Sequence, residues 1–375
     1  MSIESVIYGD LPGAVFEFRF YHGNPYHCCA LKATFAFDAG GELELLEEQP
    51  PLVFGDHYDI DIAGGNPQDP VTTGDLLYLS DLTPYKPVTD LLIIGSVSAP
   101  GGRPVERWAG QIVCGKLAKA LIFTGPRAWR IGRAHGWRLG KPQPTTSVPL
   151  RYSLAYGGRA RFDIPYAKHK PEDLDMRNPI GRGFLAAREK QIGIDYPAPQ
   201  IELPEQPVRD DPHHAVAPAG FGPIPGHFMA RLNLAGTYDK RWRDEVAPNV
   251  PLDMDLRYWN GAPADQQIGP NLEGNETVSL IQLLPEPRID LELPNLIGWA
   301  QVDREDGTKD VQQMWLDTVC IDLDARHLIL RWGWLTPFAD DIRRISLHCP
   351  RQSEWQRDAQ DDSQQDAEPA ESPNA

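Results

Sequence analysis

The sequence predicts a mainly β fold: a β-rich α+β protein whose antiparallel sheets form a sandwich or barrel-like arrangement, with long Pro/Gly-rich loops and a few short helices. Two observations lead to this prediction. The 375 residues include 33 Gly and 36 Pro, which together make up roughly 18% of the chain. This share is above the usual value of about 12% but below the roughly 25–30% that is typical of structureless chains. Several segments also alternate between apolar and polar residues, as strands with one buried face do.

The N-terminal part of the chain supplies the first strands. In residues 14–20 three phenylalanines alternate with Val15, Glu17 and Arg19, so the two sets face opposite sides of a strand. Residues 90–99 (DLLIIGSVSA) form a mostly apolar run, which favours a buried strand. The turn PGGRP that follows them predicts a hairpin with residues 105–113. Further strands are expected at residues 29–37, 117–123 and 151–156.

The rest of the chain is less regular. Residues 162–225 are rich in Pro, Gly, Asp and His, with one helix expected at 183–191. A short amphipathic helix capped by Thr237 or Asp239 is expected at 237–246. The strict alternation of residues 252–259 predicts a strand. Residues 314–323 and 327–334 flank a turn at 324–326 and predict a second hairpin, and residues 338–348 are interpreted as a closing helix.

These elements predict one β-rich domain over residues 1–350. The same pattern allows two lobes, 1–161 and 226–350, joined by the irregular residues 162–225. Residues 351–375 hold seven acidic and two basic side chains and few apolar ones, a composition that is typical of a disordered acidic tail.

Charge and cysteine content exclude several classes of function. The net charge of −17 disfavours nucleic acid and anionic membranes as main partners, because binding to phosphates needs a basic surface. No apolar run reaches the ~18 residues of a membrane span, and the N-terminus lacks the pattern of a secretory signal. The five cysteines are few and odd in number, which predicts reduced thiols and a cytoplasmic protein.

Motifs for cofactors and metals are weak. Residues 110–116 have the spacing of a phosphate-binding loop, but Leu117 replaces the hydroxyl residue that would meet magnesium, and the segment has the pattern of a strand. Residues 181–186 match a dinucleotide fingerprint without the strand that should precede it. Two groups of possible metal ligands lack the spacing of zinc sites. The first consists of His22, His27, Cys28 and Cys29, and the second of His213 and His214. We expect no cofactor and no metal.

Paired acids are the remaining catalytic signal. Asp253 and Asp255 share one face of the expected strand, and with Glu276 they are the candidate acids of a carbohydrate-active hydrolase. Arg257 lies on the same face, where it balances the acids, so a solvated strand face explains the pattern better. We expect no enzymatic activity.

Two proline-containing loops have the chemistry of recognition surfaces. Tyr85 and Lys86 lie between two prolines, and Arg127 and Trp129 follow Pro126. A rigid loop loses little entropy on binding, and Trp and Arg are enriched at interface hot spots. With Arg182 in a Gly-rich loop, these residues are our candidates for protein contacts. The alternative is that the aromatic residues belong to the core.

Eight blocks of sequence resemble one known family. They occur in order between residues 81 and 330, within a resemblance that extends from about residue 10 to about residue 335. They read DLTPYKPVTDLLIIGS, TGPRAW, PLRYSLAYGG, NPIGRGF, PAGFGPI, LAGTYDKRW, PLDMDLRYWNGAPADQQI and LDTVCIDLDARHLIL. Together they resemble the bacterial family called domain of unknown function 2169, whose members are typically encoded beside type VI secretion genes.

The resemblance implies an adaptor or chaperone without catalysis or cofactor. Such a protein would bind a secreted effector of the PAAR or Rhs type and help to load it onto the VgrG spike. The hydrolase is one alternative, and a structural component of the secreted particle is another. The resemblance assigns no binding residues, so the five contacts above are inferred from the residues themselves.

Overall fold

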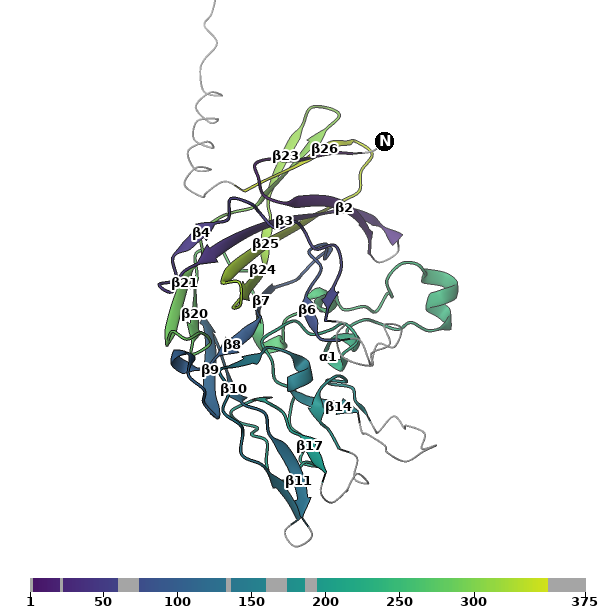
Figure 1. Ribbon diagram of the computed structural model, residues 1–375. Helices are drawn as coiled ribbons and strands as arrows, with labels where there is room; N and C mark the ends of the chain where they lie inside the picture. The colour runs from purple at the N-terminus through teal and green to yellow at the C-terminus, as the bar shows by residue number, and fades with distance from the viewer. Residues whose placement is uncertain are drawn as a thin grey trace, which may run out of the picture.

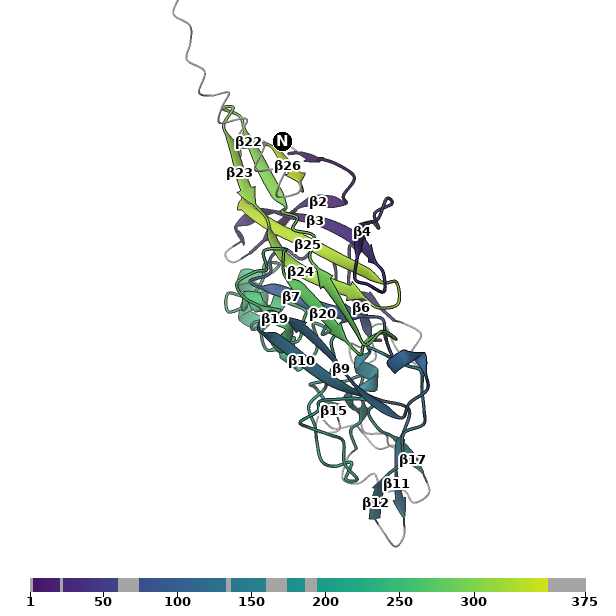
Figure 2. The same cartoon turned by 90° about the vertical axis from the view of Figure 1, so that its left-hand side faces the viewer.

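The computed structural model describes residues 3–20, 23–59, 74–132, 136–159, 174–185 and 194–349. Within these residues the fold is mainly β, as predicted, with strands gathered into several sheets and very little helix. The molecule is elongated in both views, with β22, β23 and β26 at one end and β11, β12 and β17 at the other (Figures 1 and 2). No helix among the described residues is long and apolar enough to cross a membrane.

The largest sheet in the described residues has seven strands, in the order β19-β7-β24-β25-β3-β2, with β4 beside β3. Its strands are β2 (Gly13–Arg19), β3 (Pro25–Phe37), β4 (Leu43–Leu45), β7 (Thr89–Ile94), β19 (Gln267–Ile268), β24 (Trp315–Asp322) and β25 (His327–Pro337). The predicted strands at 14–20 and 29–37 are confirmed, and so is the second hairpin, because β24 pairs with β25. The pairing of β7 with β24 is parallel, so the sheet is mixed.

The second sheet has five strands, in the order β18-β10-β9-β20-β21. They are β9 (Arg107–Cys114), β10 (Leu117–Thr124), β18 (Ile201–Glu202), β20 (Thr277–Ile281) and β21 (Arg288–Glu292). The segment with phosphate-loop spacing is a tight hairpin, since Cys114 pairs with Leu117 and Gly115 has a φ of 56°. Its backbone groups therefore form a ladder, as its apolar pattern indicates.

The other sheets are smaller, and two of them lie at the ends of the molecule (Figures 1 and 2). The end sheet contains β1 (Glu4–Ile7), β22 (Trp299–Arg304), β23 (Lys309–Gln313) and β26 (Ile342–His348). The sheet at the opposite end contains β11 (Ala128–Gly132), β12 (Gly136–Leu139) and β17 (Asp195–Pro197). The remaining short strands are β5 (His57–Tyr58), β6 (Leu76–Tyr78), β8 (Ser96–Ser98), β13 (Ser147–Pro149), β14 (Tyr156–Arg159), β15 (Leu174–Asp175) and β16 (Arg182–Gly183).

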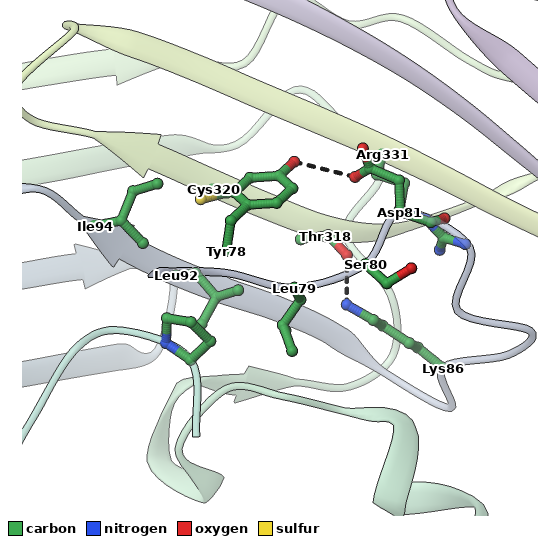
Figure 3. A pocket seen from close by; sticks show the side chains of 11 residues that line it. Tyr78, Leu79, Ser80, Asp81, Lys86, Leu92, Ile94, Thr318, Cys320 and Arg331 are labelled. Carbon is green, nitrogen blue, oxygen red and sulfur yellow. Dashed lines mark hydrogen bonds between the residues drawn. The ribbon is translucent and has the colours of Figure 1, made fainter. Parts of the chain in front are cut away.

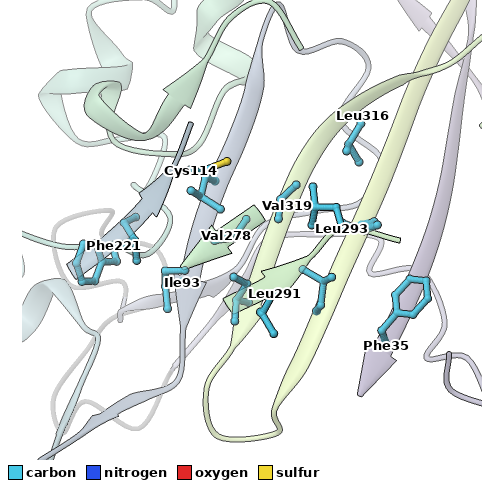
Figure 4. Packing of buried hydrophobic residues seen from close by; sticks show 14 of the residues in the cluster. Phe35, Ile93, Cys114, Phe221, Val278, Leu291, Leu293, Leu316 and Val319 are labelled. Atoms are coloured by element: carbon cyan, nitrogen blue, oxygen red, sulfur yellow. The ribbon is translucent and has the colours of Figure 1, made fainter. Parts of the chain in front are cut away.

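The two large sheets pack face to face around one hydrophobic core (Figure 4). Leu91, Val319 and Leu330 come from the seven-stranded sheet, and Val278 and Leu291 come from the five-stranded sheet; all are fully buried. Both sheets take strands from residues 1–161 and from residues 226–350, so the two segments share one core. The boundaries of the domain and of the acidic tail stay predictions, and residues 351–375 lie outside the described residues.

The other face of the seven-stranded sheet carries buried charges. Lys32 on β3 and Arg331 on β25 are direct cross-strand partners and are only 3% and 2% exposed. Like charges that face each other across a sheet are destabilising. Each cation therefore needs a carboxylate as its partner. The segment that follows β6 supplies one of these carboxylates, Asp81.

Residues 79–88 cover this face and aim their polar groups at it (Figure 3). Asp81 accepts a hydrogen bond of 2.8 Å from Lys32 Nζ and one of 3.1 Å from the Tyr78 hydroxyl. Arg331 donates to the carbonyl oxygens of Asp81 and Thr83 and pairs with Asp317. Three cations and three carboxylates form this buried charge network, and they are Lys32, Lys86, Arg331, Asp81, Asp90 and Asp317.

Some expected elements are wrong. Residues 338–348 form strand β26 rather than a helix, because β1 and β22 pair with its two edges. Residues 252–259 form turns and a 3-10 helix (Leu256–Trp259) rather than a strand, since the Asp255 side chain accepts from the Arg257 N–H and caps that turn. Residues 151–156 contain a 3-10 turn (Tyr152–Leu154) rather than a strand.

The first expected hairpin is also wrong. After the kink at Gly95 (φ 87°), β8 pairs with β13, whereas β9 pairs with β10 and β20. The turn at Pro100–Gly102 therefore connects two sheets. The helix expected at 237–246 is present in shortened form as a π-helical turn (Trp242–Val246), and Asp239 caps it. Most of the helix expected at 183–191 lies outside the described residues. The other described helices are α1 (Met229–Leu232) and a 3-10 turn (Ala264–Gln266).

The buried charge network predicts a large effect for Asp90→Asn. Asp90 is fully buried and accepts from Lys86 Nζ at 2.9 Å and from the Gly261 N–H at 2.8 Å. Its loss leaves Lys86 buried without its counter-charge, so the free energy of unfolding should fall by about 3–5 kcal/mol. Urea denaturation measures this. Adding Lys86→Met should recover part of the loss, and a double variant no more stable than Asp90→Asn would contradict this account.

Three histidines predict a loss of stability in mild acid. The Nε2 atoms of His27, His227 and His348 are buried and have no hydrogen-bond partner among the described residues. Burial lowers the pKa of each, although Glu17 partly offsets this at His27. The unfolded chain therefore takes up protons below about pH 6.5 while the folded chain resists them.

The free energy of unfolding should accordingly fall as the pH decreases from 7.5 to 5.5. Each histidine contributes a slope of at most about 1.4 kcal/mol per pH unit. Urea denaturation across this range measures the slope, and each single His→Gln variant should reduce it. If all three variants keep the slope of the unaltered protein, these histidines are not its source.

Candidate functional site

The five predicted contact residues separate into two groups. Arg127, Trp129 and Arg182 come together around β11, although Arg182 is distant from the other two in sequence. Tyr85 and Lys86 lie on the covering segment of the seven-stranded sheet. The structure therefore brings three of the five to one place.

Lys86 does not lie on the surface. It is 3% exposed, donates a hydrogen bond of 2.8 Å to Thr318 Oγ1, and pairs with Asp90. Here the prolines of the loop hold a cation inward, against a sheet, so direct contact with a partner is not available to it in this conformation. Tyr85 is half-buried and packs edge-on against Trp315, with 5.8 Å between the ring centroids.

The β11–β12 hairpin is amphipathic because its residues alternate. Trp129 faces Leu139 and Ile131 faces Trp137 across the hairpin, whereas Arg130 faces Arg138. Aromatic and aliphatic side chains therefore lie on one side of the sheet and guanidinium groups on the other.

The apolar side anchors the hairpin to the body of the protein. Trp129 is 1% exposed and donates from Nε1 to the carbonyl oxygen of Arg209 at 2.7 Å. A Cβ atom at Gly183, whose φ is 95°, would lie 3.0 Å from the Trp129 ring, so glycine permits this close approach. Trp137 packs edge-on against Tyr196 and His213. Trp129 is thus an anchor rather than a surface contact.

The charged side faces a hollow of about 590 Å³. Among the described residues, five basic side chains and one carboxylate line it. They are Arg127, Arg130, Arg138, Lys141, Arg182 and Asp195. We call this site the basic hollow. Its charge is opposite to that of the chain as a whole, which is −17.

Two of the cations form the fixed part of the basic hollow. The Arg127 side chain is 6% exposed and pairs at 3.1 Å with Glu202, whose side chain is 1% exposed. Burial lowers the pKa of Arg127, and the Glu202 carboxylate opposes that effect. Arg182 donates from Nε to the carbonyl oxygen of Ser153 at 2.7 Å and from Nη1 to Gln200. These contacts hold both guanidinium groups in place.

The other cations are exposed. Arg130 forms a two-pronged pair with both oxygens of Asp195, at 2.5 and 2.7 Å. This hydrogen bonding lowers the pKa of Asp195 and raises that of Arg130. Arg138 Nη1 lies 3.3 Å from Asp210 Oδ2, and the other oxygen of this carboxylate accepts from the Leu139 N–H. Lys141 is exposed and has no side-chain partner in the described part of the chain.

The basic hollow is suited to binding carboxylates or other oxyanions. Guanidinium groups donate in a fork that matches a carboxylate. The contacts predicted from the sequence did not include Arg130, Arg138, Lys141 or Asp195. The alternation of Trp129 with Arg130 and of Trp137 with Arg138 was a signal for the two arginines. Nothing local links Asp195 to Arg130, because the two meet through strand pairing.

The candidate acids of a hydrolase are engaged in local structure. Asp253 accepts from the N–H and hydroxyl of Thr237, and Asp255 pairs with Arg257. These bonds lower the pKa of both aspartates, whereas a general acid needs a raised one. Glu276 accepts from the N–H groups of Glu273 and Gly274. None of the three lines the basic hollow.

The motif and metal candidates gain no support from the described residues. Within the described ranges, no group of three or more His, Cys, Asp or Glu is placed to hold a metal ion. Arg182 and Gly183 form a strand beside β14 rather than opening a helix, while Ala186 lies outside the described residues. His22 also lies outside them.

The buried pair under the basic hollow predicts a strong effect for Glu202→Gln. Glu202 accepts from Arg127, from Arg107 and from the Val208 N–H. Removing its charge leaves Arg127 buried without a counter-charge, so the free energy of unfolding should fall by about 3 kcal/mol.

Asp290→Asn is the matched control, because Asp290 pairs with Arg288 at the surface, where the two side chains are 44% and 58% exposed. Loss of an exposed pair should cost less than about 1 kcal/mol. Urea denaturation of both variants measures the difference. Equal losses would show that burial does not govern the Arg127–Glu202 pair.

Comparison with known proteins identifies one family. A family model described as "Uncharacterized protein conserved in bacteria (DUF2169)" matches residues 22–333. The comparisons find no significant match among curated proteins or among solved structures. Because the match covers most of the chain, the protein belongs to this bacterial family, domain of unknown function 2169.

Proposed function

We propose that this protein is a non-catalytic cytoplasmic adaptor that binds a type VI secretion effector of the PAAR or Rhs type and helps to load it onto the VgrG spike. The sequence resemblance implies this role, since family members are typically encoded beside type VI secretion genes. Membership of the family over residues 22–333 supports it.

The observation that carries the proposal is the basic hollow on an acidic protein. Five cations converge on one concave surface, while the chain has a net charge of −17. Such a local reversal of charge gives a partner one preferred place and orientation. The surface lies on a hairpin anchored by Trp129, so little flexibility is lost when a partner binds.

Exposed apolar side chains provide a second type of contact. Met229, Leu232, Tyr238 and Leu252 are 40%, 46%, 56% and 49% exposed. They belong to one stretch that folds back on itself, because the Thr237 N–H and hydroxyl donate to Asp253. In our proposal these groups cover apolar surface of the effector until the spike is assembled.

The five cysteines agree with a reducing compartment. All are unpaired, and four of them are buried. Burial raises the pKa of Cys114 to about 11 and that of Cys349 to about 12, which keeps both as unreactive thiols at neutral pH.

Co-expression with the effector encoded beside its gene tests the proposal. The effector should co-purify with the protein, and deletion of the gene should reduce both the solubility and the export of the effector. An adaptor that is released before export should be nearly absent from the culture supernatant.

Each other outcome has a definite meaning. No co-purification and unchanged effector export would overturn the adaptor role. Recovery of the protein in the supernatant at the abundance of the effector would replace it with that of a structural component of the secreted particle.

A further inference from the structure

The exposed cations of the basic hollow stand in a row. Arg138 on β12 faces Arg130 on β11, and Arg130 faces Asp195 on β17. The side chains are therefore on the same side of the sheet, at neighbouring positions. Lys141 lies two residues after the end of β12 and lines the same hollow.

This row contains more positive than negative charge. Arg130 and Arg138 are direct cross-strand partners, and like charges in that arrangement repel. Asp195 and Asp210 neutralise them from the two flanks. Both pairs are well exposed, with side-chain exposures of 66% and 53% for Arg130 and Asp195, so each contributes little to stability.

We propose that the basic hollow binds an extended acidic polypeptide segment of the partner. In the free protein Asp195 and Asp210 form ion pairs with Arg130 and Arg138, and the carboxylates of that segment replace them on binding. This inference rests on the proposed adaptor function, which it deepens by naming the chemistry of the bound segment. The two-pronged contact between Arg130 and Asp195 is the geometry that an incoming carboxylate takes over.

An acidic polypeptide fits better than nucleic acid or an anionic membrane. Both of those present long arrays of phosphates, and the −17 charge of the whole chain repels them. An acidic segment of a few residues needs a positive surface only as large as the basic hollow. Arg127 and Arg182 form its fixed part, and Arg130, Arg138 and Lys141 are the groups free to change partners.

This exchange of partners predicts opposite effects on affinity when basic and when acidic residues of the site are replaced. Arg138→Glu with Lys141→Glu removes attraction and should weaken binding of an acidic peptide by roughly tenfold or more. Asp195→Asn removes the internal competitor for Arg130 and should strengthen binding by about two- to fivefold. A variant that merely unfolds the hairpin would not bind more tightly.

The full chain can be tested by fluorescence anisotropy with a labelled peptide of about eight alternating Glu and Asp residues, which extends over roughly 25 Å. Its Gln/Asn counterpart is the peptide control. The matched protein control is Lys309→Glu with Arg343→Glu, because both residues are exposed and belong to the sheet at the opposite end (Figure 1). We expect binding of the acidic peptide alone, weakening at higher salt, and no change in the control variant.

Several results would overturn the inference. They are no binding of the acidic peptide, an equal loss in the control variant, and unchanged or weaker binding by Asp195→Asn. Tighter binding of an oligothymidine with the same dependence on Arg138 and Lys141 would make the site a nucleic-acid groove instead.

Co-expression separates this inference from the adaptor role. If the effector co-purifies equally with the unaltered protein and with the Arg138→Glu, Lys141→Glu variant, the adaptor role stands and the basic hollow is not its binding site. If the acidic peptide binds as expected but the effector does not co-purify and its export is unchanged on deletion of the gene, the basic hollow stands and the adaptor role is wrong.

Discussion

The fold depends on charges that are neutralised inside it. Lys32 and Arg331 face each other across β3 and β25, and both are almost completely buried. Their carboxylate partners come from residues 79–88 and from β24, so removal of the covering segment would expose the two cations and leave Lys32 without its counter-charge. The same segment contains Lys86, whose partner Asp90 on β7 accepts from residues 260–262 as well. One polar cluster thus connects four distant stretches of chain.

Local patterns predict the fold class and the longer strands of the two large sheets, because the apolar residues of those strands either alternate or run continuously. They do not predict the shorter strands β20 and β21. Local patterns fail where contacts with residues distant in sequence determine the secondary structure. Residues 342–348 are a strand since β1 and β22 bind both of its edges. Residues 256–259 are a 3-10 helix since Asp255 caps them, although the preceding residues alternate like a strand.

The candidate site was predictable to a smaller extent. Chemistry alone pointed to Arg127, Trp129 and Arg182, and these three do meet. It could not distinguish an anchoring Trp129 from an exposed one, or show that Lys86 is turned inward, because burial depends on the covering segments. Asp195 becomes visible as a partner of Arg130 only through the pairing of β11 with β17.

The strand order has a consequence for synthesis of the protein. The longest strand of the first part of the chain, β3, pairs with β25, which ends at residue 337. A ribosome adds about 5–20 residues per second, so β3 waits roughly 15–60 s for this partner. During that interval its apolar edge is available to other chains, and contacts so distant in sequence form slowly. A protein that we propose as a chaperone therefore passes through a stage in which it depends on protection itself.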